Sequence, residues 1–287
     1  MCLCWWMSPA RCKTGRLYGQ KTEGRQKEFH REALEIVLAA GRELTGRRGA
    51  EHIKEKGHTD YVTEVDVRVQ QFIFRELSRI DPGAQFLGEE KDNSGVDMNG
   101  RVWILDPVDG TTNFIHDFQH SVVSLACSER GRITSGIVYD PYRRECFEAQ
   151  EGWGAFLNKR PVSVSKAAEL SQCLIAVGTS PGHRERADES FRKMRAVYDR
   201  CQDIRRVGSA ALELCYVACG RLDGFFEERL KLWDYGAAGL ILREAGGWIQ
   251  ADERQVAAGT PGIREELLGL VGDETDKKLY SSDREGM

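Results

Sequence analysis

One short acidic segment could bind a metal ion next to a phosphate group. Asp106 and Asp109 lie three positions apart, with Pro107 between them. Because proline restricts its own backbone, a turn at Pro107 would let the two carboxylates face one point. Gly110 and Thr111 follow, and their amides at a helix start would suit a phosphate. Carboxylate oxygens are preferred ligands of Mg²⁺ and Ca²⁺, so the segment predicts a hard-cation site. The alternative is a turn in which the aspartates only cap a helix.

Two further acidic residues favour the metal site. Glu89 follows an expected strand, and Asp234 begins an expected helix. Taken alone, Glu89 would be a solvated loop acid and Asp234 a helix N-cap. Four acids brought together without a cation would cost several kcal/mol in repulsion and desolvation. A bound metal removes that cost, so the four acids are expected to form one site.

The elements that position these acids follow from the spacing of apolar residues. The expected helices lie at 27–46, 63–80, 184–198, 209–219 and 233–244. The expected strands lie at 85–87, 102–105, 121–128, 133–139, 146–150, 154–157, 174–177 and 222–226. Helices, a strand-rich middle and then alternating strands and helices predict an α/β (α+β) fold with layers in the order αβαβα.

Length and charge describe an ordinary globular protein. The 287 residues are 41% hydrophobic and 30% charged, and the net charge of -4 gives no reason to expect nucleic-acid binding. Residues 1–26 carry five basic residues and one acidic residue, and we expect a disordered extension there. Residues 27–287 are expected to form a single domain, with halves at about 27–165 and 166–272 and a flexible tail at 273–287.

The cysteines and the N-terminus bear on location. Nine cysteines are an odd number and lack the paired spacing of a zinc site, which fits a reducing cytoplasm. The apolar stretch at residues 1–7 is too short to span a membrane and has no clear cleavage site after it. We therefore expect a cytoplasmic protein without a membrane segment.

The sequence resembles the inositol monophosphatase family, with bacterial members as the nearest match, over about residues 27–272. Two signatures carry the resemblance, DPVDGTTNF at 106–114 and WDYGAAG at 233–239. A third segment, DYVTEVD at 60–66, matches the upstream acidic motif of the family. The resemblance implies the five-layered αβαβα sandwich of sugar phosphatases, Mg²⁺-dependent hydrolysis of a small phosphate monoester and inhibition by lithium.

The resemblance also implies two to three bound Mg²⁺ ions. By position, Glu89, Asp106 and the main-chain carbonyl of Val108 match the ligands of the first ion. Asp106, Asp109 and Asp234 match those of the second, with Asp106 bridging the two. A more weakly held third ion would use Glu89 and water. The ions would activate a water molecule and neutralise the leaving alkoxide.

Catalytic roles follow from the same match. The resemblance implies that Thr111, oriented by Asp66, takes the proton of the attacking water, with Glu89 as a further catalytic residue. The alternative for Asp66 is an ordinary cap before its helix. No covalent phospho-enzyme is needed.

Substrate recognition is expected from the same motifs and from later residues. The family offers backbone amides to a polyol from a loop that matches residues 206–211, and Glu227 matches the position that accepts a substrate hydroxyl. The alternative for Glu227 is a surface acid beside Glu228. The substrate-binding residues implied are Asp109, Gly110, Thr111, Gly208, Ser209, Ala210, Glu227 and Asp234.

Three functional hypotheses remain. The first is hydrolysis of inositol 1-phosphate, which Thr112 favours because the nucleotide branch of the family usually carries a lysine there. The second keeps the chemistry and changes the substrate to histidinol phosphate, a sugar phosphate or a nucleotide 3′-phosphate. The third is a regulatory protein that binds the transcription machinery. The resemblance also implies a homodimer.

Overall fold

The structure is a computed structural model that describes residues 18–46, 53–57 and 60–272. Within these ranges the chain forms two large sheets and a small hairpin. The seven-stranded sheet has the order β3 (Gln85–Gly88), β4 (Arg101–Asp109), β5 (Val122–Glu129), β6 (Arg132–Asp140), β7 (Glu145–Gln150), β8 (Ala155–Leu157) and β9 (Arg160–Val162). β3 and β4 are parallel, and the following pairs are antiparallel.

The five-stranded sheet is assembled from the second half of the chain. Its order is β11 (Asp203–Arg205), β10 (Leu174–Val177), β12 (Gly224–Glu228), β14 (Gln255–Gly259) and β13 (Trp248–Ala251). The strands β11, β10 and β12 are parallel, whereas β14 is antiparallel to both of its neighbours. A separate hairpin joins β1 (Ile53–Gly57) to β2 (Asp60–Thr63).

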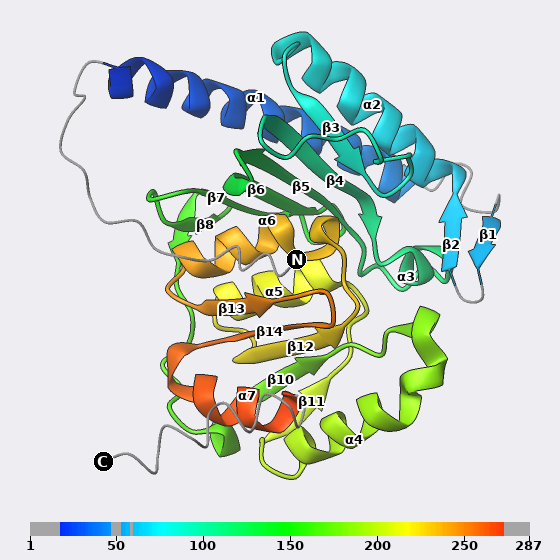
Figure 1. Ribbon diagram of the computed structural model, residues 1–287, viewed down its shortest axis with the longest axis vertical. Helices are drawn as coiled ribbons and strands as arrows, with labels where there is room; N and C mark the ends of the chain where they lie inside the picture. Colours follow the sequence, from blue (N-terminus) through cyan, green and yellow to red (C-terminus); the bar gives the residue numbers. More distant parts are fainter. Residues whose placement is uncertain (1–17, 47–52, 58–59, 273–287) are drawn as a thin grey trace.

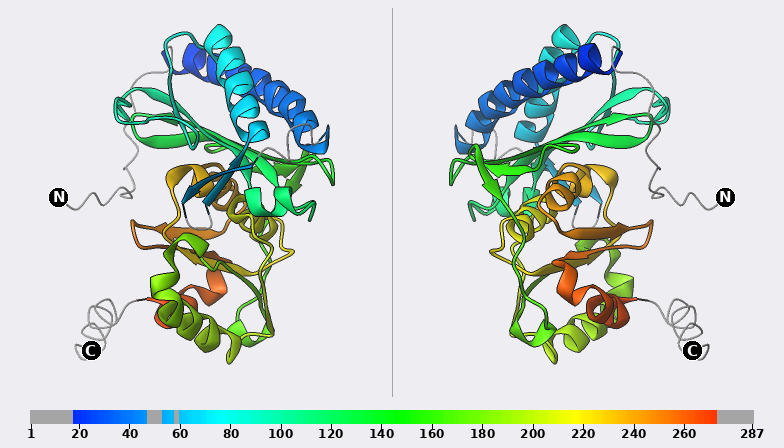
Figure 2. Two further views of the ribbon diagram at one scale, coloured as in Figure 1. Left: turned by 90° about the vertical axis from the view of Figure 1, so that its right-hand side faces the viewer. Right: turned by 90° about the vertical axis from the view of Figure 1, so that its left-hand side faces the viewer.

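Helices separate and cover the two sheets (Figure 1). α1 (Tyr18–Gly46) and α2 (Glu64–Ile80) cover the outer face of the seven-stranded sheet, and α5 (Ala210–Ala218) and α6 (Leu232–Glu244) lie between the sheets. α4 (Ala187–Tyr198) and α7 (Arg264–Val271) cover the other face of the five-stranded sheet. The side views show the same stacking (Figure 2). The expected αβαβα order of layers is confirmed.

The sequence of each helix matches its layer. α2 buries Val65, Val69, Ile73 and Leu77 on one face, as an outer helix should. α5 and α6 are apolar on nearly all sides because sheets cover both of their faces. α6 also approaches β6 closely, since a Cβ atom on Gly136 would lie 2.6 Å from the carbonyl oxygen of Ala237. Gly136 of β6 therefore allows α6 to pack closely against the seven-stranded sheet.

Some boundaries differ from the expected ones. α1 begins at Tyr18 rather than at residue 27, so it continues into the expected N-terminal extension. The expected helix at 184–198 starts as a 3₁₀ segment, Pro181–Arg186, before α4. The strands β1, β2, β9, β11, β13 and β14 and the helix α7 were not predicted, because short or polar segments show no clear periodicity. None of the helices in the described ranges is long and apolar enough to cross a membrane.

Candidate active site

Asp106 and Asp109 reach the same side of β4 through an irregularity in the sheet. Asp106 pairs with Ser124 of β5 and Asp109 pairs with Val122, so three steps along β4 match two along β5. In a regular strand, residues three apart point to opposite faces, whereas one extra residue restores the same face. The expected turn at Pro107 is wrong, because the strand continues to Asp109 and a bulge brings the two carboxylates together.

Four acidic side chains form what we call the carboxylate cluster: Glu89, Asp106, Asp109 and Asp234. Asp106 and Asp109 are buried, whereas Glu89 and Asp234 are partly buried. Burial raises the pKa of Asp106 well above its usual value, and the negative charges of Glu89, Asp109 and Asp234 raise it further. A positive charge is therefore needed to stabilise the ionised carboxylates of the cluster.

The Asp109 carboxylate lies at the N-terminus of α5. Its Oδ2 atom accepts hydrogen bonds of 2.7 Å from the Ser209 hydroxyl and 2.7 Å from the Ala211 amide. Burial raises the pKa of Asp109 to about 6, and the bonds from Ser209, Ala211 and Ala210 limit that rise. This contact joins the seven-stranded sheet to the middle helical layer.

Asp234 lies in the first turn of α6. Lys231 occupies the N-cap position, and its amide donates to Oδ2 of Asp234 at 2.6 Å. Asp234 is therefore the third helical residue and not the N-cap itself. Burial raises the pKa of Asp234 well above its usual value; the Lys231 amide lowers it, and the charges of Asp109 and Glu89 raise it again.

Asp66 connects α2 to the motif that follows β4. Its Oδ2 atom accepts from the amide and the hydroxyl of Thr63, which caps α2. Its Oδ1 atom accepts from the Thr111 hydroxyl at 3.3 Å, and that hydroxyl also lies 3.1 Å from the carbonyl oxygen of Val108. Burial is the main cause that raises the pKa of Asp66. Asp66 thus makes the contacts of a helix cap and also contacts Thr111. Its capping role therefore does not exclude the expected role in orienting Thr111.

The loop at residues 207–210 leads into α5 and faces α3 (Thr111–Ile115). Gly208 has φ of +90°, and a Cβ atom there would lie 2.8 Å from Nη1 of Arg206. The Asn113 amide nitrogen donates to the carbonyl oxygens of Val207 and Gly208 at 2.8 and 3.2 Å. Asn113 is part of the first signature, but its contact to this loop could not be read from spacing along the chain.

Glu227 is a buried residue of β12, so the surface-acid alternative is wrong. Its Oε1 atom accepts from the Ser180 amide at 3.2 Å, and burial raises its pKa. The neighbouring Glu228 points to the other side of the strand, where Lys193 of α4 donates to it at 2.7 Å. Ser180 is a contact that the sequence did not indicate.

The side chains fit a hard cation by their chemistry, because carboxylates and the Val108 carbonyl supply only oxygen ligands. Within the described ranges, however, no three Asp, Glu, His or Cys side chains already converge as a metal-binding set. One oxygen of Asp109 and one of Asp234 bind backbone amides instead. The carboxylates already lie near one another, but their side chains would have to rearrange to bind a metal ion.

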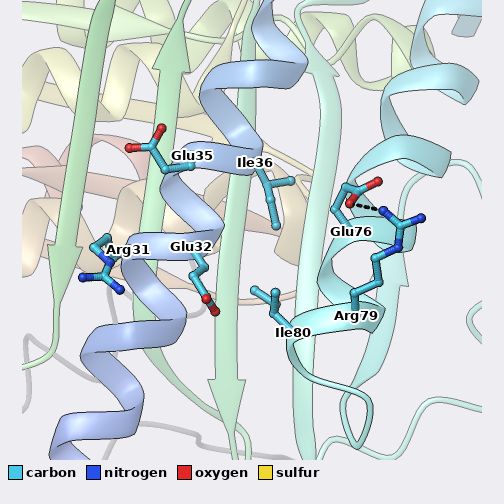
Figure 3. Close-up of a pocket in the computed structure, with 7 residues that line it drawn as sticks. All are labelled: Arg31, Glu32, Glu35, Ile36, Glu76, Arg79 and Ile80. Atoms are coloured by element: carbon cyan, nitrogen blue, oxygen red, sulfur yellow. Dashed lines mark hydrogen bonds and ion pairs between the residues drawn. The ribbon is translucent and has the colours of Figure 1, made fainter.

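A surface groove of about 470 Å³ lies elsewhere, between α1 and α2 (Figure 3). It is lined by Arg31, Glu32, Glu35, Ile36, Glu76, Arg79 and Ile80. Arg79 pairs with Glu76 across 2.5 Å. No residue of the three signature segments lines this groove, which belongs to the outer helical layer.

Comparisons with known proteins agree on one family. The model of the inositol monophosphatase family matches residues 25–277. The chain is 42% identical to Nus factor SuhB of Xylella fastidiosa over 199 residues, covering 69% of this chain and 71% of the relative. It is 40% identical to the inositol-1-monophosphatase of Rhizobium meliloti over 218 residues, 75% of this chain and 82% of the relative.

Solved structures agree with these sequence matches. The extragenic suppressor protein suhB from Bartonella henselae superimposes with a TM-score of 0.79 at 35% identity, covering 86% of this chain and 99% of that one. The family model covers most of the sequence, and the signature residues lie together in the fold. The chain belongs to the inositol monophosphatase family, whose members are phosphoric monoester hydrolases.

Proposed function

We propose that this chain hydrolyses inositol 1-phosphate to inositol and inorganic phosphate with bound Mg²⁺. The observation that carries the proposal is the carboxylate cluster, in which neighbouring charges raise the pKa of Asp106 and Asp234. Such a cluster needs a cation to ionise fully, and a phosphate ester adds more negative charge. The relatives named inositol-1-monophosphatase support the choice of substrate.

The proposed ligands are the expected ones. Glu89, Asp106 and the Val108 carbonyl would hold a first ion, and Asp106, Asp109 and Asp234 a second. A third, weaker ion would use Glu89 and water, and we expect Li⁺ to inhibit the enzyme by replacing that ion. When bound, these ions supply the positive charge that activates the attacking water and stabilises the leaving alkoxide.

Thr111 and Asp66 provide a path for the proton. The water oxygen forms a bond to phosphorus while the ester P–O bond breaks, and the water gives up a proton. The Thr111 hydroxyl accepts that proton as it passes its own to Asp66, whose Oδ1 atom lies 3.3 Å away. Asp66 is held in place by Thr63, and Glu89 would act as a further catalytic carboxylate.

Substrate recognition would use both sides of the site. The amides of Gly110 and Thr111 would bind the phosphate group, and those of Gly208, Ser209 and Ala210 would bind the polyol. Asp109, Glu227 and Asp234 would accept hydrogen bonds from substrate hydroxyls. Histidinol phosphate, a sugar phosphate and a nucleotide 3′-phosphate use the same chemistry and remain alternative substrates.

The test is phosphate release by purified protein with and without Mg²⁺. Asp106→Asn and Asp234→Asn should each lose at least about a thousandfold in kcat while they retain the fold. Asp199→Asn, an exposed aspartate on the outer layer, serves as the control and should keep full activity. Inositol 1-phosphate should be preferred over histidinol phosphate, fructose 1,6-bisphosphate and a nucleotide 3′,5′-bisphosphate. Full activity of Asp106→Asn after removal of metal would contradict the proposal.

A second candidate function rests on the relatives named Nus factor SuhB, at 37–42% identity. It is a regulatory role in which the chain binds the transcription machinery. Binding to a purified transcription complex that persists in Asp106→Asn would support this role independently of catalysis. Loss of binding in that variant would tie the two functions together. We further propose a homodimer, as the resemblance to the family implies. We also propose a cytoplasmic location, because the free thiols of the described cysteines would persist in a reducing compartment.

A further inference from the structure

Glu213 is an unexpected residue for its position. It belongs to α5, whose other residues are apolar, weakly polar or aromatic, and its side chain is fully buried. An apolar side chain would pack into this layer at lower cost, because burying a carboxyl group requires compensation. The carboxyl group at this position is therefore expected to make a specific polar contact.

The Glu213 side chain reaches back past the start of its own helix. Its Oε1 atom accepts a 2.6 Å hydrogen bond from the Val207 amide. Its Oε2 atom is buried and has no hydrogen-bond partner among the described residues. The Val207 bond is thus the polar contact that accounts for an acid at this position.

Three further hydrogen bonds hold the same 207–210 loop. Asn113 donates to the carbonyl oxygens of Val207 and Gly208, and Ser209 donates to Asp109. Asn113 lies on α3, Asp109 on β4 and Glu213 on α5, so three separate elements fix one short loop. Glu213 holds an amide of the loop, whereas Asn113 holds its carbonyls.

The surrounding charges allow this contact without an ion pair. Glu227 of β12 and Asp109 of β4 repel a charge on Glu213, whereas Arg206, which precedes the loop, attracts it. Burial is the largest cause that raises the pKa of Glu213 to about 8. Near neutral pH the group is mostly protonated, and its second oxygen still accepts from Val207.

We propose that Glu213 is a positioning residue that orients the Gly208, Ser209 and Ala210 amides toward the substrate by fixing Val207. This inference rests on the proposed function, which assigns those amides to polyol binding. Glu213 itself does not touch the substrate. It acts through the backbone, so its removal should weaken substrate binding more than it slows the chemical step.

The experiment compares Glu213→Ala, which removes the acceptor, with Glu213→Gln, which keeps an acceptor oxygen of similar size. Val217→Ala is the matched control, because Val217 is buried one turn later on the same helix. Two quantities are measured on the full chain: KM and kcat for inositol 1-phosphate, and hydrogen exchange of the Val207 amide. Thermal unfolding of all variants shows how much stability each loses.

Glu213→Ala should raise KM about tenfold with kcat within about threefold, and should speed exchange at Val207 about tenfold or more. Glu213→Gln should keep both values near those of the wild type, and Val217→Ala should lose stability without a change in KM. An unchanged Val207 exchange rate in Glu213→Ala would overturn the inference, as would faster exchange with an unchanged KM. A wild-type protein that releases no phosphate would defeat the proposed function, whereas the exchange result would still decide whether Glu213 holds the loop.

Discussion

The Thr111 hydroxyl donates to the Asp66 carboxylate across 3.3 Å, although the residues are 45 positions apart. The same hydroxyl lies 3.1 Å from the Val108 carbonyl, and its single proton can serve only one acceptor at a time. The pair links α2, which begins at the acidic motif, to α3, which begins at the first signature. This link is the geometric basis of the proposed proton path.

We expect Thr111→Val to lose about a hundredfold or more in kcat, because it keeps the shape of the side chain and removes the hydroxyl. Thr111→Ser keeps the hydroxyl and should retain activity within about tenfold. Steady-state kinetics at saturating Mg²⁺ measures both. If Thr111→Val and Thr111→Ser were equally active, Thr111 would have no part in proton transfer.

Ser209→Ala should affect both the helix and the neighbouring acid. Ser209 caps α5, accepting from the Leu212 amide at 3.4 Å, and its loss should cost about 1 kcal/mol of unfolding free energy. Its hydroxyl is also the main group that lowers the pKa of Asp109, now about 6. Without this hydroxyl the pKa of Asp109 rises. Mg²⁺ affinity, which falls at low pH as Asp109 becomes protonated, should therefore begin to fall at a higher pH. Titrations of Mg²⁺ at several pH values, with Ser209→Thr as the control, measure the shift. If Mg²⁺ affinity fell at the same pH in Ser209→Ala as in the wild type, the Ser209 hydroxyl would not lower the pKa of Asp109.

The metal-free protein should become less stable as pH rises. Asp109, with a pKa of about 6, and Glu213, with a pKa of about 8, hold their protons more tightly in the folded chain than their usual values of 3.8 and 4.5 imply. The folded state therefore binds more protons than the unfolded state, and the unfolding free energy falls from about pH 4 to about pH 8.

Mg²⁺ should reduce this fall, because a bound cation stabilises the ionised carboxylates and releases their protons. Urea unfolding at about pH 5 and about pH 8, with EDTA and with excess Mg²⁺, tests the expectation. Glu213→Gln should flatten part of the metal-free slope. Stability that increases with pH in EDTA would show that the carboxylates are not destabilised as described.

Gly208→Ala should be more harmful than the same change at Gly246. Both glycines have positive φ, +90° and +89°, but a Cβ atom at Gly208 would meet Arg206 and Asn113, whereas nothing lies within 4 Å at Gly246. Gly246→Ala should therefore cost about 1 kcal/mol from its backbone alone, and Gly208→Ala about 2–3 kcal/mol together with a raised KM. If Gly208→Ala and Gly246→Ala lost equal stability in thermal unfolding and had equal KM values, the 207–210 loop would accommodate the added Cβ atom without harm.

Local patterns predicted much of this molecule. The apolar face of α2 and the strand-rich middle depend on neighbours within a few positions, and the order of the elements then indicates the layers. Glu89 and Asp234 could likewise be placed after β3 and at the start of α6, whereas Asp106 lies inside β4 and not after its end. These predictions succeed because the responsible contacts repeat along short stretches of chain.

Long-range contacts could not be predicted in this way. The bulge between Asp106 and Asp109 depends on how β5 pairs with β4. Glu227 and Glu228 look alike in the sequence, yet one accepts from Ser180 and the other pairs with Lys193. Glu213 reads as one polar residue in an apolar helix, and only the fold shows that it holds Val207.

The bond between Ser209 and Asp109 spans 100 positions and crosses from the middle helices to the seven-stranded sheet. A chain whose two halves had each formed their own secondary structure but had not yet docked would show a nearly complete circular dichroism spectrum. It would nevertheless have no assembled carboxylate cluster and no ordered loop. During refolding, enzymatic activity should therefore return later than helical signal, and the delay between them would time the docking of the halves.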